Sequence, residues 1–175
     1  DLPWFFKKNF RLDGLKDHEH VRLLFEGLGY SANIYLNGKL VASRDTVRGP
    51  FSTYAVDVTK TAKEENTLVV ETFKCEPGDF NIGFVDWNPR PLDESMGIVR
   101  PVSVQRCGDV VIESPRVCSR VNLNTMKEAW LDVEAQLRTL SDHDVSGQLV
   151  CTFEGQEYSL PVTLRAGQVR TVRLD

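Results

Sequence analysis

Three consecutive side chains, Asp86, Trp87 and Asn88, form the group whose types and spacing best suit ligand binding. A carboxylate and an amide can hydrogen-bond sugar hydroxyls, while a flat indole ring stacks on the apolar face of a pyranose. The group lies in the segment FVDWNPRPLDESMGIVRPVSV, residues 84–104. A solvated loop gains nothing from a tryptophan, so we interpret this segment as a sugar-binding loop. The alternative for Trp87 is that it packs on the edge of the fold.

The same segment holds carboxylates that could in principle do acid–base chemistry. A glycosidase needs two carboxyl groups about 5 to 9 Å apart around the scissile bond. Asp86 with Asp93 or Glu94 could supply them, but a loop without rigid support holds catalytic acids poorly. We therefore expect ligand contact from Asp86 and no catalytic residue in this chain. The sequence contains neither a nucleophile elbow nor a phosphate-binding glycine loop.

Composition argues against several other function classes. The 175 residues carry a net charge of −4 without a basic run, so nothing favours nucleic-acid binding. No apolar stretch reaches the roughly 20 residues of a membrane span. The four cysteines lack CxxC spacing, so we expect no metal and no cofactor. Most of the cysteines are expected to be unpaired and buried, and the alternative is one or two disulfides, for example between Cys107 and Cys118, which are close in sequence. His18 and His20, which flank Glu19, are interpreted as part of a solvated turn.

Apolar and polar residues alternate with a period of two, which predicts an all-β fold. Residues 21–25 and 131–137 are clear examples, and Asn37-Gly38 between two apolar runs predicts a tight hairpin. Turn signals between such runs indicate antiparallel sandwiches. The ligand-binding segment then lies in a long loop, residues 75–95, between two strands. Tyr35 faces solvent in this pattern and is a second candidate platform, although packing is the favoured interpretation.

The strands divide into two domains of different kinds. We predict a jelly-roll-like β-sandwich over residues 1–107 and an immunoglobulin-like β-sandwich over residues 108–175. The second has about five strands where about seven are usual, so we expect it to be incomplete. The chain is therefore interpreted as a truncated fragment of a longer protein. Trp4 and Trp130 are expected to pack in a core or on a sheet.

Several segments, in order, resemble the N-terminal part of the family 2 glycoside hydrolases. Those enzymes include β-galactosidases, β-glucuronidases, β-mannosidases and exo-β-glucosaminidases. Each segment alone is weak, but the ordered set is specific. The resemblance implies a jelly-roll, galactose-binding-like sugar-binding domain, an immunoglobulin-like domain and then a TIM barrel with the catalytic glutamates. The matching segments are WFFKKNF, ANIYLNGKLVA, GPFSTYAVDVT, NTLVVE and MGIVRPVSV.

The segment VDWNPRPLDESMGIVRPV is most similar to exo-β-glucosaminidases and β-mannosidases. In that family the loop reaches the mouth of the barrel's active site, where an aspartate and a neighbouring aromatic contact the terminal sugar. The matching residues here are Asp86 and Trp87. β-Mannosidases usually carry an aromatic directly before the aspartate, whereas Val85 stands here, which favours the glucosaminidase type. The resemblance ends before the barrel and so implies no catalytic residue in this chain.

We predict a non-catalytic N-terminal fragment of a retaining exo-β-glycosidase that releases terminal glucosaminide, mannoside or galactoside units from oligosaccharides. Its predicted substrate contacts are Asp86, Trp87 and Asn88. Its predicted partners are that carbohydrate and a C-terminal TIM barrel of the same chain, with no nucleic acid and no membrane. The substrate class suggests a periplasmic or secreted protein. Two alternatives stay open: a stand-alone carbohydrate-binding module without hydrolase activity, and a structural cell-surface sandwich with a protein partner.

Overall fold

The structure of the protein, a computed structural model, describes residues 2–80, 87, 89 and 91–174. All the secondary-structure elements in this described part are β-strands, so the predicted all-β fold class is confirmed. The same residues contain no helix long and apolar enough to cross a membrane. In these described residues the regular structure consists of sheets, and their topology decides which side chains meet.

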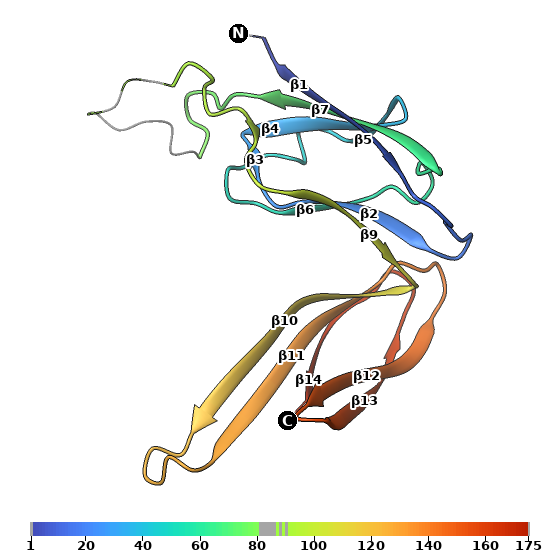
Figure 1. Cartoon of the computed structure of the whole chain (residues 1–175), viewed down its shortest axis with the longest axis vertical. Helices are drawn as coiled ribbons and strands as arrows, with labels where there is room; N and C mark the ends of the chain where they lie inside the picture. The colour runs from blue at the N-terminus through green and yellow to red at the C-terminus, as the bar shows by residue number, and fades with distance from the viewer. Residues whose placement is uncertain (1, 81–86, 88, 90, 175) are drawn as a thin grey trace. The chain divides into compact units, whose positions relative to one another are not determined.

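The first unit, Asp1–Arg106, is a β-sandwich around one core (Figure 1). Its strands are β1 (Trp4–Arg11), β2 (His20–Phe25), β3 (Leu28–Gly29), β4 (Ser31–Leu36), β5 (Lys39–Ala42), β6 (Tyr54–Asp57), β7 (Glu65–Phe73), β8 (Gly97–Ile98) and β9 (Val102–Cys107). One sheet has the order β1-β7-β4-β5 and the other the order β6-β2-β9, while β3 pairs with β8. The unit ends one residue before the predicted domain boundary.

Alternation of side chains across the strands builds this core. In β2, Val21, Leu23 and Phe25 are each at most 1% exposed. In β7, Leu68 and Val70 are buried in the same way. Because successive strand residues point to opposite faces, the period of two correctly predicted which of these side chains lie inside. The core is mainly aliphatic and consists of Leu12, Val21, Leu23, Phe25, Leu28, Ala32, Ile34, Leu36, Val47, Val58, Leu68 and Val70.

The predicted hairpin joins β4 to β5 at Asn37-Gly38, where φ is 53° and 79°. These positive values suit the turn type that Asn-Gly favours, so this prediction is confirmed. The Asn37 side chain also donates to the Thr61 carbonyl at 2.9 Å and accepts from the Thr67 amide at 3.0 Å. The turn is thereby tied to β7, which fixes the register of the sheet.

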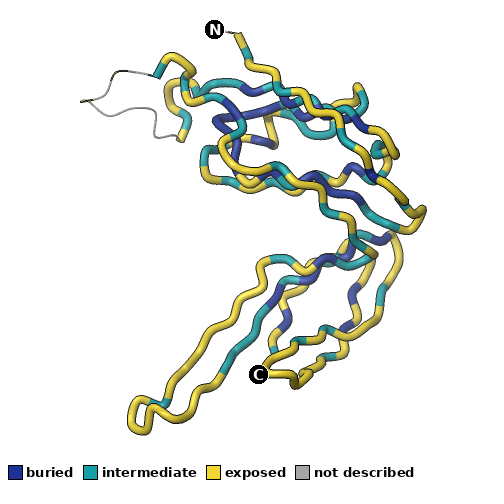
Figure 2. The backbone as a smooth tube through the Cα atoms, in the orientation of Figure 1, coloured by how far each residue is buried: buried dark blue, intermediate teal, exposed yellow. Residues whose placement is uncertain are grey.

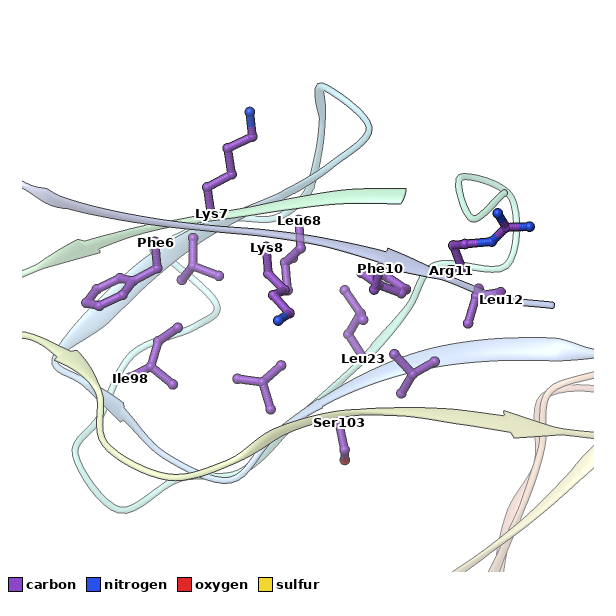
Figure 3. A pocket seen from close by; sticks show the side chains of 13 residues that line it. Phe6, Lys7, Lys8, Phe10, Arg11, Leu12, Leu23, Leu68, Ile98 and Ser103 are labelled. Atoms are coloured by element: carbon purple, nitrogen blue, oxygen red, sulfur yellow. The ribbon is translucent and has the colours of Figure 1, made fainter. Parts of the chain in front are cut away.

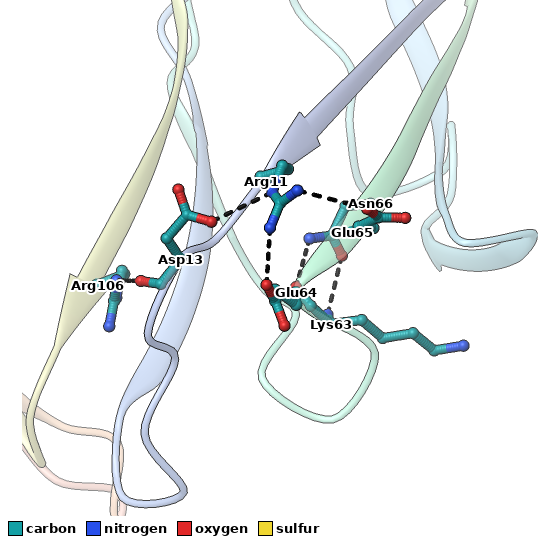
Figure 4. Close-up of polar contacts among 7 residues, drawn as sticks. All are labelled: Arg11, Asp13, Lys63, Glu64, Glu65, Asn66 and Arg106. Carbon is teal, nitrogen blue, oxygen red and sulfur yellow. Dashed lines mark hydrogen bonds and ion pairs between the residues drawn. The ribbon is translucent and has the colours of Figure 1, made fainter.

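Charged side chains close the end of this unit near the start of β7 and the end of β9 (Figure 4). Arg11 forms ion pairs with Asp13 at 3.2 Å and with Glu64 at 2.8 Å. Arg106 donates to the Asp13 carbonyl at 2.8 Å and forms an ion pair with Glu19. The expectation of a solvated turn is therefore wrong for Glu19, because its side chain is bound by an arginine from a distant strand.

The seam between β1 and β9 is open and forms an apolar groove of about 390 Å³ (Figure 3). Phe6, Phe10 and Leu23 line it, and Lys8 lies on the same face of β1 as the two phenylalanines. In the order of the described strands, β1 and β9 are both sheet edges. A charged residue on the inner face of an edge strand discourages pairing with other chains, which is the role we give Lys8.

The second unit, Cys107–Asp175, is a smaller β-sandwich. Its strands are β10 (Val110–Val121), β11 (Ala129–Thr139), β12 (Val145–Phe153), β13 (Gln156–Leu164) and β14 (Val169–Leu174). One sheet has the order β10-β11-β14, and β12 pairs with β13. This places the first, second and fifth strands of the unit in one sheet. Fewer positions are buried than in the first unit (Figure 2), and the core consists of Ala135, Leu137, Val162, Leu164 and Val172.

The cysteines differ from their predicted burial. No disulfide joins them in the part of the chain that the structure describes. Cys118 is exposed, and Cys75, Cys107 and Cys151 are only partly buried. The expectation of buried cysteines is therefore wrong, because these thiols lie outside the two small cores. Separately, β10 contains an irregularity, since its register with β11 shifts between Glu113 and Arg116.

Candidate functional site

The long loop that joins β7 to β8 is held at its first end by an arginine–aspartate pair. Arg48 Nη2 donates to Asp79 Oδ1 at 2.6 Å, and the guanidinium lies 5.8 Å from the centroid of the Tyr30 ring. Asp79 Oδ2 also accepts from the Glu76 amide at 2.9 Å. The start of the loop is thus fixed to the segment that follows β5.

This first anchor keeps Asp79 ionised. The backbone hydrogen bond from Glu76 and the positive charge of Arg48 lower the pKa of Asp79, although partial burial opposes them. The Asp79 side chain is only 18% exposed, against 52% for Arg48. Because an arginine and a backbone amide already bind its carboxylate, Asp79 has a structural role at the start of the loop.

The second end of the loop is held by a tight turn against β3. Asp93 Oδ1 accepts from the Ser95 amide at 3.0 Å, and the Asp93 carbonyl accepts from the Met96 amide at 2.9 Å. Gly29 in β3 pairs with Gly97 in β8. A Cβ added at Gly29 would lie 2.3 Å from the Ser95 carbonyl oxygen, so only glycine fits there. Asp93 therefore shapes the turn that holds this end of the loop.

Of the predicted contact residues, Trp87 is the one that the structure describes. Its side chain is 81% exposed, so the alternative of packing on the edge of the sandwich is wrong. Asp86 and Asn88 lie outside the described residues. Phe80 and Leu92, on either side of the group in sequence, are 83% and 104% exposed. The described part of the loop therefore presents large apolar side chains to solvent between two anchored ends.

The described residues do not gather metal ligands. They contain no group of three or more histidine, cysteine, aspartate or glutamate side chains that could hold an ion. The candidate site consists of an exposed tryptophan and its supporting contacts. An exposed indole can stack on an apolar ring face and donate one hydrogen bond.

Comparisons with known proteins decide the family. Residues 1–77 match the family described as "Glycosyl hydrolase 2 galactose-binding domain-like". An exo-beta-D-glucosaminidase of Arthroderma benhamiae is 31% identical over 188 residues, which cover 100% of this chain and 21% of that protein. An exo-beta-D-glucosaminidase of Amycolatopsis orientalis is 30% identical over 173 residues, which cover 98% of this chain and 16% of that protein. The chain belongs to glycoside hydrolase family 2.

Solved structures of family 2 enzymes have the same fold. The exo-chitosanase of Amycolatopsis orientalis matches with a TM-score of 0.87 at 30% identity, over 98% of this chain and 20% of that one. A beta-glucuronidase of Bacteroides uniformis matches with a TM-score of 0.72 at 16% identity, over 97% of this chain and 21% of that one. The second likeness shows the fold alone. This family 2 chain spans about a fifth of the length of these relatives.

Sequence reasoning missed the residues that support the loop of this family 2 chain. Arg48 and Asp79 are 31 positions apart, and neither the period of two nor a turn motif links them. Gly29 carried no signal either, because its requirement comes from a backbone oxygen on a distant segment. To find the requirement at Gly29, one would have had to predict that β3 pairs with β8.

Proposed function

We propose that this family 2 chain is the non-catalytic N-terminal part of a retaining exo-β-glycosidase that removes terminal β-linked glucosamine from oligosaccharides. Both relatives named above are exo-beta-D-glucosaminidases. The Amycolatopsis orientalis enzyme has also been crystallised with PNP-beta-D-glucosamine. These relatives favour a glucosaminide over the mannoside and galactoside that the sequence left open.

The observation that carries this proposal is the exposed Trp87 on a loop anchored at both ends. Trp87 is 81% exposed, so its indole ring is accessible to a partner. A pyranose ring is such a partner, because its apolar face stacks on the indole. In this proposal Asp86 and Asn88 accept and donate hydrogen bonds to the sugar, and the Asp86 carboxylate attracts the ammonium at C2. The loop thus forms part of the active-site rim.

The chemistry itself is assigned to a TIM barrel of the same polypeptide. A retaining mechanism needs two carboxyl groups about 5–5.5 Å apart on rigid supports, and barrel strand ends provide such supports. Binding energy from the rim can be used to stabilise the transition state. The chain by itself is then inactive. A polymeric sugar substrate also supports the proposal that the protein is periplasmic or secreted.

Kinetics of the longer protein test the rim contact. Asp86→Ala and Trp87→Ala should each lower kcat/KM for an aryl β-glucosaminide about tenfold or more, with unchanged Tm. The matched control is Phe80→Ala, which removes an equally exposed aromatic from the same loop and should leave kcat/KM unchanged. Equal kinetics in all three variants would remove the loop from the site. Turnover by the 175-residue chain alone would contradict its non-catalytic role.

A further inference from the structure

The outward face of the four-stranded sheet carries a cluster of polar and aromatic side chains, which we call the sheet cluster. It is built around Glu71 of β7, which lies directly opposite Phe5 of β1 on one side and Asn33 of β4 on the other. Tyr35 lies two residues along β4 from Asn33 and therefore on the same face. The intervening residues of β7, Val70 and Thr72, point into the core. The sheet cluster consists of Phe5, Asn33, Tyr35, Glu71 and Phe73.

Hydrogen bonds hold the polar members of the sheet cluster in place. Glu71 Oε2 accepts from Asn33 Nδ2 at 2.9 Å and from Tyr35 Oη at 3.2 Å. Asn33 Oδ1 in turn accepts from the Arg44 amide at 2.8 Å. A ligand that binds to side chains already ordered in this way loses less conformational entropy. The arrangement is therefore preorganised for a polar partner.

No described cation pairs with the charge of Glu71. In the part of the chain that the structure describes, its carboxylate takes part in no ion pair, and its two hydrogen-bond donors are a neutral amide and a neutral phenol. Both donors reach the same oxygen, so Oε1 keeps its acceptor capacity. Partial burial, followed by the charge of Glu71, raises the pKa of Tyr35, which keeps the phenol protonated as a donor.

Aromatic rings flank this carboxylate. Phe5, directly across from Glu71, is 63% exposed and offers a free ring face. On the other side the Arg44 guanidinium stacks on Phe73, 4.1 Å from the ring centroid. An exposed ring beside an ordered carboxylate and amide matches the two needs of a saccharide, an apolar face to stack on and hydroxyls to bond.

We propose that the sheet cluster is a second carbohydrate-binding site that takes a β-linked oligosaccharide, with a pyranose stacked on Phe5 and hydroxyls bonded to Glu71 and Tyr35. This site uses none of the loop residues of the proposed function and does not depend on that function. A protein partner is the less suitable occupant. Burying the Glu71 carboxylate under a protein surface is costly without a matching cation, whereas sugar hydroxyls can donate to it directly.

The test uses the 175-residue chain itself, labelled with ¹⁵N and titrated with two probes. One probe is the β-1,4-linked glucosamine tetramer and the other is cellotetraose, which lacks the ammonium groups. We expect saturable amide shifts at Phe5, Tyr35 and Glu71. Equal affinities would identify the hydroxyls as the recognised groups, and tighter binding of the glucosamine tetramer would identify the ammonium as an added contact. Either result supports the site.

Variants locate the binding. Glu71→Gln, which keeps the shape and the acceptor oxygen, and Phe5→Ala should each raise the Kd about tenfold. The matched control is Asn9→Ala, on the same face of the sheet but outside the sheet cluster. It removes a similar side-chain hydrogen bond, in which Thr67 Oγ1 donates to Asn9 Oδ1 at 2.9 Å. That control should leave the Kd unchanged. Phe5 makes no side-chain hydrogen bond, so Phe5→Ala keeps the test valid if Glu71→Gln does not fold.

Two results would overturn the proposal. The first is the absence of saturable shifts with both tetramers at their solubility limits. The second is binding that survives Glu71→Gln and Phe5→Ala but is lost in Trp87→Ala, which would assign all carbohydrate contact to the loop. The kinetic test of the rim uses the longer protein and a different readout, so the two proposals can fail separately.

Discussion

The two units show the same alternation of side chains but differ in how completely their inner faces are covered. In the first unit, twelve residues form the buried core, and several of them, such as Leu23 and Ile34, are fully buried. In the second unit, five residues form the core. Both units consist of two facing sheets, so the difference in core size is not a difference in architecture. It comes from how much of the inner face of each sheet is covered by the opposite sheet.

The inner face of the second unit continues well beyond its core. In β11, Leu131 and Val133 lie on the same face as the buried Ala135, and Val117 of β10 pairs with Val133. Val117 is 61% exposed. On the opposite sheet, Tyr158 is 47% exposed although it shares a face with the buried Val162. Apolar residues therefore face inward without being covered, and the second unit gains less stability from burial per residue.

The largest expected effect of this difference on stability comes from a matched pair of phenylalanine-to-alanine substitutions. Phe25 in the first unit is 1% exposed and Phe153 in the second is 48% exposed. Phe25→Ala should lower the free energy of unfolding of the first unit by about 3–5 kcal/mol, because it leaves a cavity. Phe153→Ala should cost the second unit about 1 kcal/mol or less.

Urea titrations of single-tryptophan variants measure each unit separately. A variant that keeps only Trp4 reports on the first unit, and one that keeps only Trp130 reports on the second. We expect the Trp130 transition at lower urea in the otherwise unchanged chain. If Phe153→Ala were as costly as Phe25→Ala, the inner face of the second unit would be covered and the comparison would be wrong.

A pair of glycine substitutions tests packing in the two units with a smaller effect. Gly29→Ala places its Cβ 2.3 Å from the Ser95 carbonyl oxygen, and this backbone overlap should cost about 1–3 kcal/mol. Gly147, on the inner face of β12, has no atom within 4 Å of an added Cβ. Gly147→Ala should instead stabilise the second unit by up to about 1 kcal/mol, because glycine weakens strand interiors.

The same single-tryptophan variants measure both substitutions. Gly29→Ala should lower the urea midpoint reported by Trp4 and leave that of Trp130 unchanged. A destabilised second unit in Gly147→Ala would mean that the space around Gly147 is filled, contrary to the packing described here.

Local pattern predicted the parts of the fold that depend on neighbouring residues. The buried residues Val21 and Leu23 followed from alternation, and the Asn37-Gly38 hairpin followed from backbone preference. Alternation identifies the face on which a side chain lies, but not whether that face is covered. This is why Trp4 and Trp130, expected to pack, are 47% and 52% exposed.

The candidate site was less predictable, because its support is made by contacts between distant segments. Trp87 was found from its type and neighbours, whereas its anchors depend on pairs such as Arg48 with Asp79. Arg106 and Glu19 are 87 positions apart, and the charge pattern of either segment alone indicates only a solvated surface. Such pairs follow from topology, which the alternation of residues does not specify.

The smallest expected effect is electrostatic. It concerns one glutamate carboxylate in each unit that is bound by arginine. In the second unit, Glu134 accepts from Arg173 at 2.6 Å and pairs with Arg116 at 3.3 Å. In the first, Glu19 is bound by Arg106, which also donates to two backbone carbonyls. The hydrogen bond from Arg173 lowers the pKa of Glu134, and the one from Arg106 lowers the pKa of Glu19.

Because both folded-state pKa values lie below the unfolded value, each contact stabilises its unit fully above the ordinary glutamate pKa of about 4.3. The stability is lost as the pH falls through the folded pKa. Arg116 and Arg173 are 62% and 68% exposed, whereas the side chain of Arg106 is 31% exposed. Salt should therefore weaken the acid response more strongly in the second unit, since about 1 M salt shortens the Debye length to about 3 Å.

Thermal unfolding between pH 3 and pH 7, with the Trp4 and Trp130 reporters at low and high salt, checks this prediction. Glu134→Gln should flatten the acid response of the second unit alone, and a salt-independent response there would show that the pair is shielded from solvent.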